Sequence, residues 1–329
     1  MGLLVKGQWQ DRWYENDDRG SFQREQSQRR HAISRSEGAL FLPERDRYHL
    51  YVSLACPWAH RTLIARRLKN LESIVSVSVV SWLMAENGWT FDTRDGSTED
   101  TLEGAHFLYE RYTADDPEYT GRVTVPVLWD RKEQRIVNNE SSDILRIFNE
   151  AFDDLTGSDI DLYPEPLRAT IDALNERIYP TVNNGVYRAG FATSQTAYEE
   201  AFDQLFETLD WLEDHLSTNR YLAGTVLTEA DIRLFTTAIR FDPVYHGHFK
   251  CNLRQIADYP HLANWMREIY QWPGIADTVD FVHIKNHYYM SHRNINPTGI
   301  VPKGPDTGLE QPHDRAALPG SGLFVKTGR

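Results

Sequence analysis

The apolar pattern between residues 47 and 80 predicts a strand, a helix and a second strand. Residues 48–52 form a short β-type run, and residues 74–80 form another. Between them, apolar side chains recur at spacings of four and three after Pro57, which predicts a helix over 57–71. Proline is favoured at a first helical position. The segment is therefore a βαβ unit, with Cys56 at its first strand-to-helix turn.

A hairpin and a further helix follow. Residues 123–129 and 135–137 flank the polar turn 130–134, a spacing typical of a β-hairpin. Pro126 is a misfit inside a strand because it cannot donate to a ladder. It fits if the Val125–Pro126 bond is cis and the backbone turns toward a site. Residues 139–142 then open a helix whose apolar side chains continue to Phe152.

The second half of the chain has a helical pattern. One long apolar stripe covers residues 198–216, another covers 262–269, and Thr228 with Asp231 has the spacing of a capping box. The predicted fold is therefore α/β plus all-α, a thioredoxin-like domain followed by a helical one. The predicted divisions are an extension over 1–46, domains over 47–155 and 164–300, and an irregular Pro- and Gly-rich tail over 301–329.

Composition narrows the function classes. The chain has 329 residues and a net charge of −13, without a Lys- or Arg-rich run, which argues against nucleic acid or an anionic membrane as main partner. No segment approaches the roughly 20 apolar residues of a membrane span, and the first residues lack the apolar stretch of a signal peptide. Two cysteines fit a reducing compartment, so we expect a cytoplasmic protein.

Cys56 has two interpretations. Free cysteine is among the most buried residue types, and most lone cysteines are inert. A helix N-terminus, however, favours an anion, and so favours a reactive thiolate. The order of the predicted elements, with a cis-proline candidate after the βαβ unit, favours the reactive interpretation.

The position three residues after Cys56 holds Ala59, where dithiol enzymes carry a second cysteine. A disulfide formed at Cys56 would then be broken by an external thiol. Cys251 could serve, but the sequence gives no sign that it lies near. A single thiol resolved by a small external thiol indicates glutathione chemistry.

Other chemical signals are weak. His283, His287 and His292 lie close in sequence, but no carboxylate or cysteine pattern completes a metal site, so no metal is expected. Glycine-rich phosphate loops are absent from the sequence. Trp58 and Trp82 fit either a site or a core.

The chain resembles the xi-class glutathione transferases, also called glutathionyl-hydroquinone reductases. The resemblance runs through nearly the whole chain, apart from the first 46 and the last 25 or so residues. It rests on the stretches YHLYVSLACPWAHR, ENGWTFD, GRVTVPVLWD, NNES, NNGVYRAGFATSQ, LTEADIRLF, RFDPVYHGHFKC and NHYYMSHRNINPTGI.

The resemblance implies a glutathione site with Cys56 as nucleophile. Trp89 would contact glutathione, and the Val125 backbone would pair with its cysteinyl part. Glu140 would take the γ-glutamyl ammonium, and Ser141 at a helix start would take its carboxylate. The remaining implied contacts are Arg122, Val123 and Thr124, with Pro126 as the structural cis-proline.

The resemblance also assigns three tyrosines to the second substrate. Tyr187 would be the general acid and base, while Tyr245 and Tyr288 would stabilise the thiolate. Because the chain has 16 tyrosines, the interpretation of each of the three as a core or interface aromatic would be favoured without the resemblance.

The implied activity is reduction of glutathionyl-hydroquinones, with glutathione as co-substrate and a Cys56–glutathione mixed disulfide as intermediate. Three alternatives stay open: a general thioltransferase or dehydroascorbate-type reductase, a conjugating transferase, and a non-enzymatic ligand carrier. A homodimer is expected from the resemblance alone.

Overall fold

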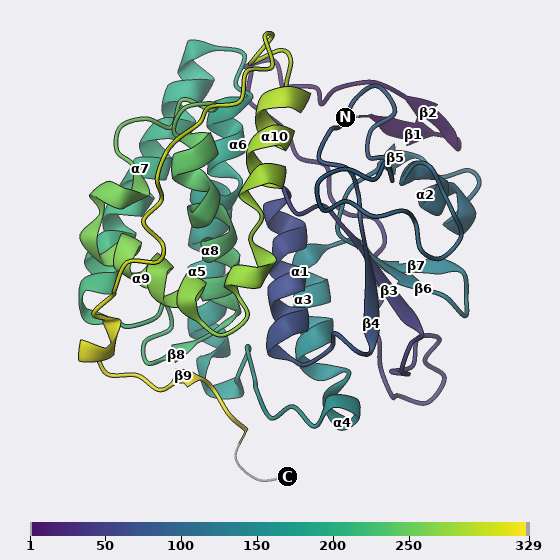
Figure 1. The fold of residues 1–329 in the computed structure, drawn as a ribbon, viewed down its shortest axis with the longest axis horizontal. Helices are drawn as coiled ribbons and strands as arrows, with labels where there is room; N and C mark the ends of the chain where they lie inside the picture. Colours follow the sequence, from purple (N-terminus) through teal and green to yellow (C-terminus); the bar gives the residue numbers. More distant parts are fainter. Residues whose placement is uncertain (1, 327–329) are drawn as a thin grey trace. The chain divides into compact units, whose positions relative to one another are not determined.

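The computed structural model describes residues 2–326, which divide into two compact units (Figure 1). The first unit comprises residues 2–14, 24–158 and 278–301. The second comprises residues 15–23, 159–277 and 302–326. The predicted division placed residues 164–300 together, so the return of 278–301 to the first unit is a difference from the sequence-based expectation.

The first unit is built around a four-stranded sheet of order β4-β3-β6-β7. Strands β3 and β4 are parallel, and the other two pairs are antiparallel. The first unit as a whole contains seven strands, of which β1, β2 and β5 form a separate small sheet. The strands are β1 (Leu3–Val5), β2 (Gln8–Gln10), β3 (Tyr48–Val52), β4 (Val75–Val79), β5 (Gly121–Arg122), β6 (Val127–Asp130) and β7 (Arg135–Asn138). Its helices are α1 (Pro57–Leu68), α2 (Tyr109–Asp115), α3 (Ser141–Glu150), α4 (Asp153–Thr156) and α10 (Phe281–Ser291).

Every residue of β3 is buried, as expected for a central strand covered on both faces. Figure 1 shows α1 and α3 side by side next to this sheet. The predicted βαβ unit is therefore present, with Cys56 between β3 and α1.

Three predicted boundaries were wrong. Helix α1 ends at Leu68 rather than residue 71, because Asn70 adopts a left-handed backbone with φ of 55°. The strand predicted over 123–129 begins only at Val127 and runs to Asp130, because residues 123–126 belong to no strand. The preceding residues 121–122 pair with β1 instead of the main sheet. Helix α3 ends at Glu150, so Phe152 lies beyond it.

The second unit is helical. Its helices are α5 (Arg168–Ile178), α6 (Gly185–Gly190), α7 (Gln195–Thr218), α8 (Glu229–Arg240) and α9 (Pro260–Gln271), with a small parallel pair of β8 (Val226–Leu227) and β9 (Gly322–Leu323). The predicted capping box is confirmed, because Thr228 and Asp231 bond reciprocally at the start of α8.

The tail is tied to this helical unit. The buried Arg315 guanidinium donates to the carbonyl oxygens of Leu216, Asn219 and Arg220, where α7 ends. Leu216 lies in the last turn of α7, where carbonyl groups lack a partner within the helix, and Asn219 and Arg220 follow that turn. The tail therefore caps the C-terminal end of α7.

Candidate active site

Cys56 stands at the N-cap of α1. Its backbone is extended, with φ of −77° and ψ of 122°, and Pro57 takes the first helical position as predicted. The Cys56 carbonyl accepts from the His60 N–H at 3.0 Å, which begins the helix. Cys56 is partly exposed, and its thiol donates to the Val125 carbonyl oxygen at 3.7 Å. A partly exposed cysteine at a helix N-terminus has the environment of a reactive thiol.

The Val125–Pro126 bond is cis, which confirms the expectation from the misplaced proline. Residues 123–126 belong to no strand and link β5 to β6. This turn brings the Val125 backbone to the Cys56 sulfur, although 69 residues separate them along the chain.

Glu140 and Ser141 lie at the start of α3. The Glu140 carboxylate caps the helix by accepting from the Ser142 N–H at 3.1 Å, and it also accepts from the Ser27 hydroxyl at 3.1 Å. The Ser141 hydroxyl accepts from the guanidinium of Arg61 at 3.3 Å. Arg61 is only 1% exposed, so a buried positive charge from α1 reaches the N-terminus of α3. This corner favours a carboxylate.

Trp89 is buried and stacks on His287 of α10, with ring centroids 4.8 Å apart and planes 22° from parallel. His287 Nδ1 forms a hydrogen bond of 2.9 Å with the Trp82 carbonyl oxygen. Tyr288, the next residue on α10, is 2% exposed. Trp89 therefore contacts the helix that carries Tyr288, although about 200 residues separate Trp89 from Tyr288 along the chain.

Arg122 holds the N-terminal extension. Its guanidinium donates to the Glu25 carboxylate at 2.9 Å and to the carbonyls of Arg12 and Trp13. It also lies 4.2 Å from the centroid of the Tyr14 ring. A contact between Arg122 and glutathione remains a prediction.

The extension brings residues to this site that sequence reasoning missed. Burial raises the pKa of the Tyr14 hydroxyl, and Cys56 is one of the nearby groups that raise it further. Arg24 lies 4.9 Å from the Trp58 ring centroid, and Arg61 lies 4.5 Å from it. Two cations thus flank the indole two residues after Cys56. Residues 1–46 have no regular periodicity, so no sequence pattern could place them here.

Tyr187 and Tyr245 lie together in the second unit. Their ring centroids are 5.9 Å apart, and both pack on Phe249. Tyr245 lies on a π-helical turn (Phe241–Tyr245), and a second such turn (Tyr179–Asn183) precedes the helix of Tyr187. Such turns are frequent at functional sites. The approach of both tyrosines to Cys56 remains a prediction.

Cys251 lies in the second unit and has no exposed surface. Its thiol donates to the Phe249 carbonyl at 3.9 Å, and burial raises its pKa. A thiol held neutral and enclosed is a poor nucleophile.

Two further features bear on the expected chemistry. Among residues 2–326, no three His, Cys, Asp or Glu side chains are arranged to hold a metal ion. Within that part of the chain, no helix combines the length and apolar character that a membrane crossing would require.

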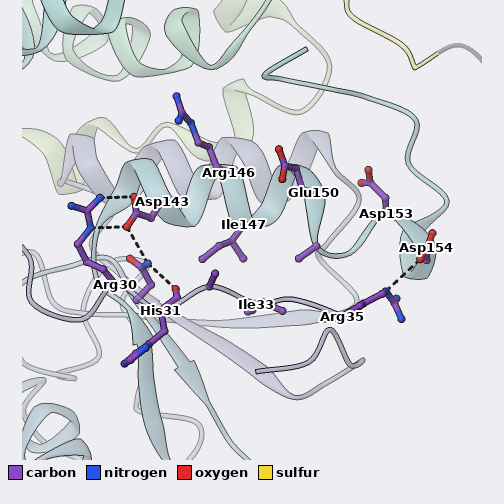
Figure 2. A pocket seen from close by; sticks show the side chains of 13 residues that line it. Arg30, His31, Ile33, Arg35, Asp143, Arg146, Ile147, Glu150, Asp153 and Asp154 are labelled. Atoms are coloured by element: carbon purple, nitrogen blue, oxygen red, sulfur yellow. Dashed lines mark hydrogen bonds and ion pairs between the residues drawn. The ribbon is translucent and has the colours of Figure 1, made fainter. Parts of the chain in front are cut away.

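A groove of about 420 Å³ lies between residues 30–35 and α3 (Figure 2). Figure 2 shows the Arg30 guanidinium facing the Asp143 carboxylate, with two contacts of 2.7 Å. None of the predicted site residues lines this groove. It marks where the extension crosses α3 rather than the site around Cys56.

Comparison with known proteins agrees with this geometry. The glutathione S-transferase N-terminal domain matches residues 55–151, and the glutathione S-transferase C-terminal domain matches residues 195–268. The chain is 57% identical over 324 residues to the glutathionyl-hydroquinone reductase YqjG of Escherichia coli strain K12, covering 96% of this chain and 98% of that protein.

Two solved structures are similar throughout. A xi-class glutathione transferase from Natrialba magadii is 48% identical with a TM-score of 0.91, covering 98% of each chain. The glutathione-bound structure of YqjG is 55% identical with a TM-score of 0.86, covering 96% of this chain and 99% of that one. The thioredoxin-like domain, the helical domain and the whole-length similarity show that the chain belongs to the xi-class glutathione transferases, the family of the glutathionyl-hydroquinone reductases.

Proposed function

We propose that this protein reduces glutathionyl-hydroquinones to hydroquinones, with Cys56 as the nucleophile. The observation that carries the proposal is the Cys56 thiol, partly exposed at the N-terminus of α1 and 3.7 Å from the Val125 carbonyl. The name of the 57% identical relative supports the choice of substrate.

The reaction has two sulfur transfers. The Cys56 thiolate attacks the glutathione sulfur of the substrate, so that a sulfur–sulfur bond forms while the bond from sulfur to the aromatic carbon breaks. The electron pair of that bond goes to the carbon, which takes a proton, and hydroquinone leaves. A glutathione thiolate then attacks the mixed disulfide, releases glutathione disulfide and restores the Cys56 thiolate.

The surroundings of Cys56 and Cys251 favour a resolving thiol that comes from outside the protein. Position 59 holds alanine, and Cys251 is enclosed with a raised pKa. We infer that glutathione itself resolves the mixed disulfide.

The glutathione cradle in this proposal consists of three parts. Trp89 covers the tripeptide, the Val125 backbone pairs with its cysteinyl part, and Glu140 and Ser141 hold the γ-glutamyl end. The buried Arg61 beside Ser141 supports the assignment, because a carboxylate bound there gains from a nearby positive charge. Arg122, Val123 and Thr124 complete the predicted contacts.

Three tyrosines have proposed roles around the leaving group. Tyr187 protonates the aromatic carbon, and Tyr245 and Tyr288 donate to the thiolate. The closeness of Tyr187 and Tyr245 within their unit supports a shared role. We further propose a homodimer in a reducing, cytoplasmic setting, which size-exclusion chromatography with light scattering and cell fractionation would test.

The decisive experiment follows hydroquinone and glutathione disulfide together, with a glutathionylated model hydroquinone and glutathione as reactants. In Cys56→Ser and Cys56→Ala, we expect turnover to fall below about 1% of the wild-type rate, because the attacking thiolate is gone. Mass spectrometry of wild type treated with substrate alone should show one glutathione on Cys56.

Three results would contradict the proposal. Turnover that survives in both Cys56 variants would mean that another group is the nucleophile. Reduction of simple glutathione mixed disulfides, with no release of hydroquinone, would favour a general thioltransferase. Glutathione binding without any turnover would favour a carrier.

A further inference from the structure

Tyr112 has no exposed surface and lies on α2, where its ring packs on Tyr119 at 5.1 Å between centroids. Its hydroxyl donates to the Thr124 carbonyl at 2.8 Å and accepts from the Thr124 N–H at 3.2 Å. It also accepts from the side-chain amide of Asn139 at 3.2 Å. A phenolic hydroxyl has one donor and two acceptor positions, and all three are used here.

The two segments joined by this hydroxyl are both parts of the proposed glutathione cradle. Thr124 immediately precedes Val125 and the cis-proline. Asn139 immediately precedes Glu140 and Ser141 at the start of α3. One buried oxygen atom therefore links the segment proposed to bind the cysteinyl part to the segment proposed to bind the γ-glutamyl part.

Asn139 and helix α2, which position the Tyr112 hydroxyl, are themselves held by further hydrogen bonds. Asn139 exchanges two hydrogen bonds with the backbone of Arg29, at 2.9 and 3.2 Å. The Arg29 guanidinium donates to Asp115 at 2.6 Å and to Asp116 at 2.9 Å, where α2 ends. Helix α2 and the extension thus hold the hydroxyl and one of its partners in place.

We propose that Tyr112 is a positioning residue for glutathione, an inference that rests on the proposed function. It contacts neither the reacting sulfur nor the tripeptide. It acts by holding Val125 and the N-terminus of α3 at the separation that the bound tripeptide requires, so that binding does not have to order them.

The substitution Tyr112→Phe tests this inference because it removes the hydroxyl and keeps the ring. The Thr124 N–H and the Asn139 amide lose a buried acceptor, and both segments relax. We expect the Kd of glutathione, measured by calorimetry, and the KM for glutathione to rise about tenfold. The rate at which iodoacetamide alkylates Cys56 should stay within about twofold of wild type, because that reagent does not use the cradle.

Tyr48→Phe is the matched control. Tyr48 is equally buried in the same unit, and its hydroxyl donates to the Leu42 carbonyl at 2.6 Å. It should lower the Tm comparably while leaving the Kd of glutathione within about twofold. Asn139→Ala provides a second variant, and its effect on binding should overlap with that of Tyr112→Phe, because both remove the hydrogen bond between the Asn139 amide and the Tyr112 hydroxyl. Asn139→Ala also removes the bond from the Arg29 N–H, so any further weakening in the double variant measures that second contact.

The outcomes separate the inference from the site assignment. Ser141→Ala tests the cradle directly, and an unchanged Kd there would overturn both the cradle and the role of Tyr112. If Ser141→Ala weakens binding but Tyr112→Phe and Asn139→Ala do not, the inference alone is overturned. A parallel loss of Cys56 alkylation in Tyr112→Phe would also overturn it, because the effect would then not be confined to the cradle.

Discussion

The two cysteines of this chain have opposite environments. Cys56 is partly exposed at the start of a helix, and Cys251 has no exposed surface. A thiol becomes a nucleophile through its thiolate, which a helix N-terminus favours and an apolar enclosure disfavours. The same side chain therefore has the environment of a reactive thiol in one place and is packed in the core in the other.

Native protein should accordingly react with about one equivalent of iodoacetamide per chain, and with about two after denaturation. Peptide mapping should locate the native label on Cys56. Cys251→Ala should keep wild-type turnover and lose about 1 kcal/mol of stability through the lost sulfur contacts. Loss of turnover in a folded Cys251→Ala protein would show that Cys251 takes part in the reaction.

For single residues, features that depend on sequence neighbours could be predicted from the sequence, whereas contacts between residues far apart in the chain could not. Pro126, Pro57 and the Thr228–Asp231 box were identified because each rule involves only neighbouring residues. Tyr112 gave no signal, because its role is a set of contacts to residues 12 and 27 positions away.

Among the secondary-structure elements, the extension covers the edge of the main sheet. The His31 N–H donates to the Val137 carbonyl at 2.9 Å, and Asn138 donates to the His31 carbonyl at 3.0 Å. Strand β7 lies at the end of the sheet order, so without this cover its backbone groups would be open to pairing with another chain.

Two arginines of the extension differ in the pairs they make. Arg29 pairs with Asp115, which is 1% exposed, whereas Arg35 pairs with the exposed Asp154 at 3.4 Å. Arg29→Met should lower the free energy of unfolding by about 1.5–3 kcal/mol, because it removes the closer of the two cations beside a buried carboxylate, Arg135 being 3.7 Å away. Arg35→Met should change it by less than about 0.5 kcal/mol. Equal losses in urea denaturation would show that burial of the pair does not matter.

Helix α10 offers a second matched pair. His287→Ala removes the ring that stacks on Trp89, and we expect the KM for glutathione to rise about fivefold with a change in tryptophan fluorescence. His283, one turn earlier, is also buried, but it bonds to the Asp95 carbonyl. His283→Ala should leave the KM for glutathione nearly unchanged. Equal effects of the two variants would mean that the stack has no specific role.

The elements were predicted better than their ends. The apolar spacing found the strand, helix and strand around Cys56, but it could not show that Asn70 turns left-handed or that β5 pairs with β1. Strand pairing with the extension depends on residues more than 100 positions away, which periodicity does not register.

At the scale of the whole molecule, two buried histidines make the free energy of unfolding depend on pH in the acid range. Burial lowers the pKa of His49 in the first unit and of His248 in the second, each to about 4. A lowered pKa means that each group contributes stability above its unfolded pKa of about 6.5, and that this contribution is lost as pH falls toward 4. The contribution is about 3 kcal/mol for each.

The free energy of unfolding, measured with urea, should therefore fall steeply between pH 6.5 and 4.5. His49→Asn should flatten this dependence, since it removes the titrating ring while retaining a partner for the Ser76 hydroxyl, which lies 2.7 Å from His49 Nδ1. An unaltered slope in that variant would assign the acid sensitivity to other groups.

The order of the two units along the chain could be predicted because the spacing of apolar residues changes, from strand-type runs in the first half to long helical stripes in the second. The return of residues 278–301 to the first unit was not. A helix shows which of its faces is apolar, but its sequence does not say which unit that face covers.

That return of α10 has a consequence for synthesis on the ribosome. A nascent chain carries Cys56 and the Val125–Pro126 turn long before His287 and Tyr288 emerge, since domains fold in the order of translation. A product released early would therefore hold a thiol without the helix against which Trp89 stacks. The proposed glutathione site is therefore completed only after residues 159–277 of the second unit have been synthesised.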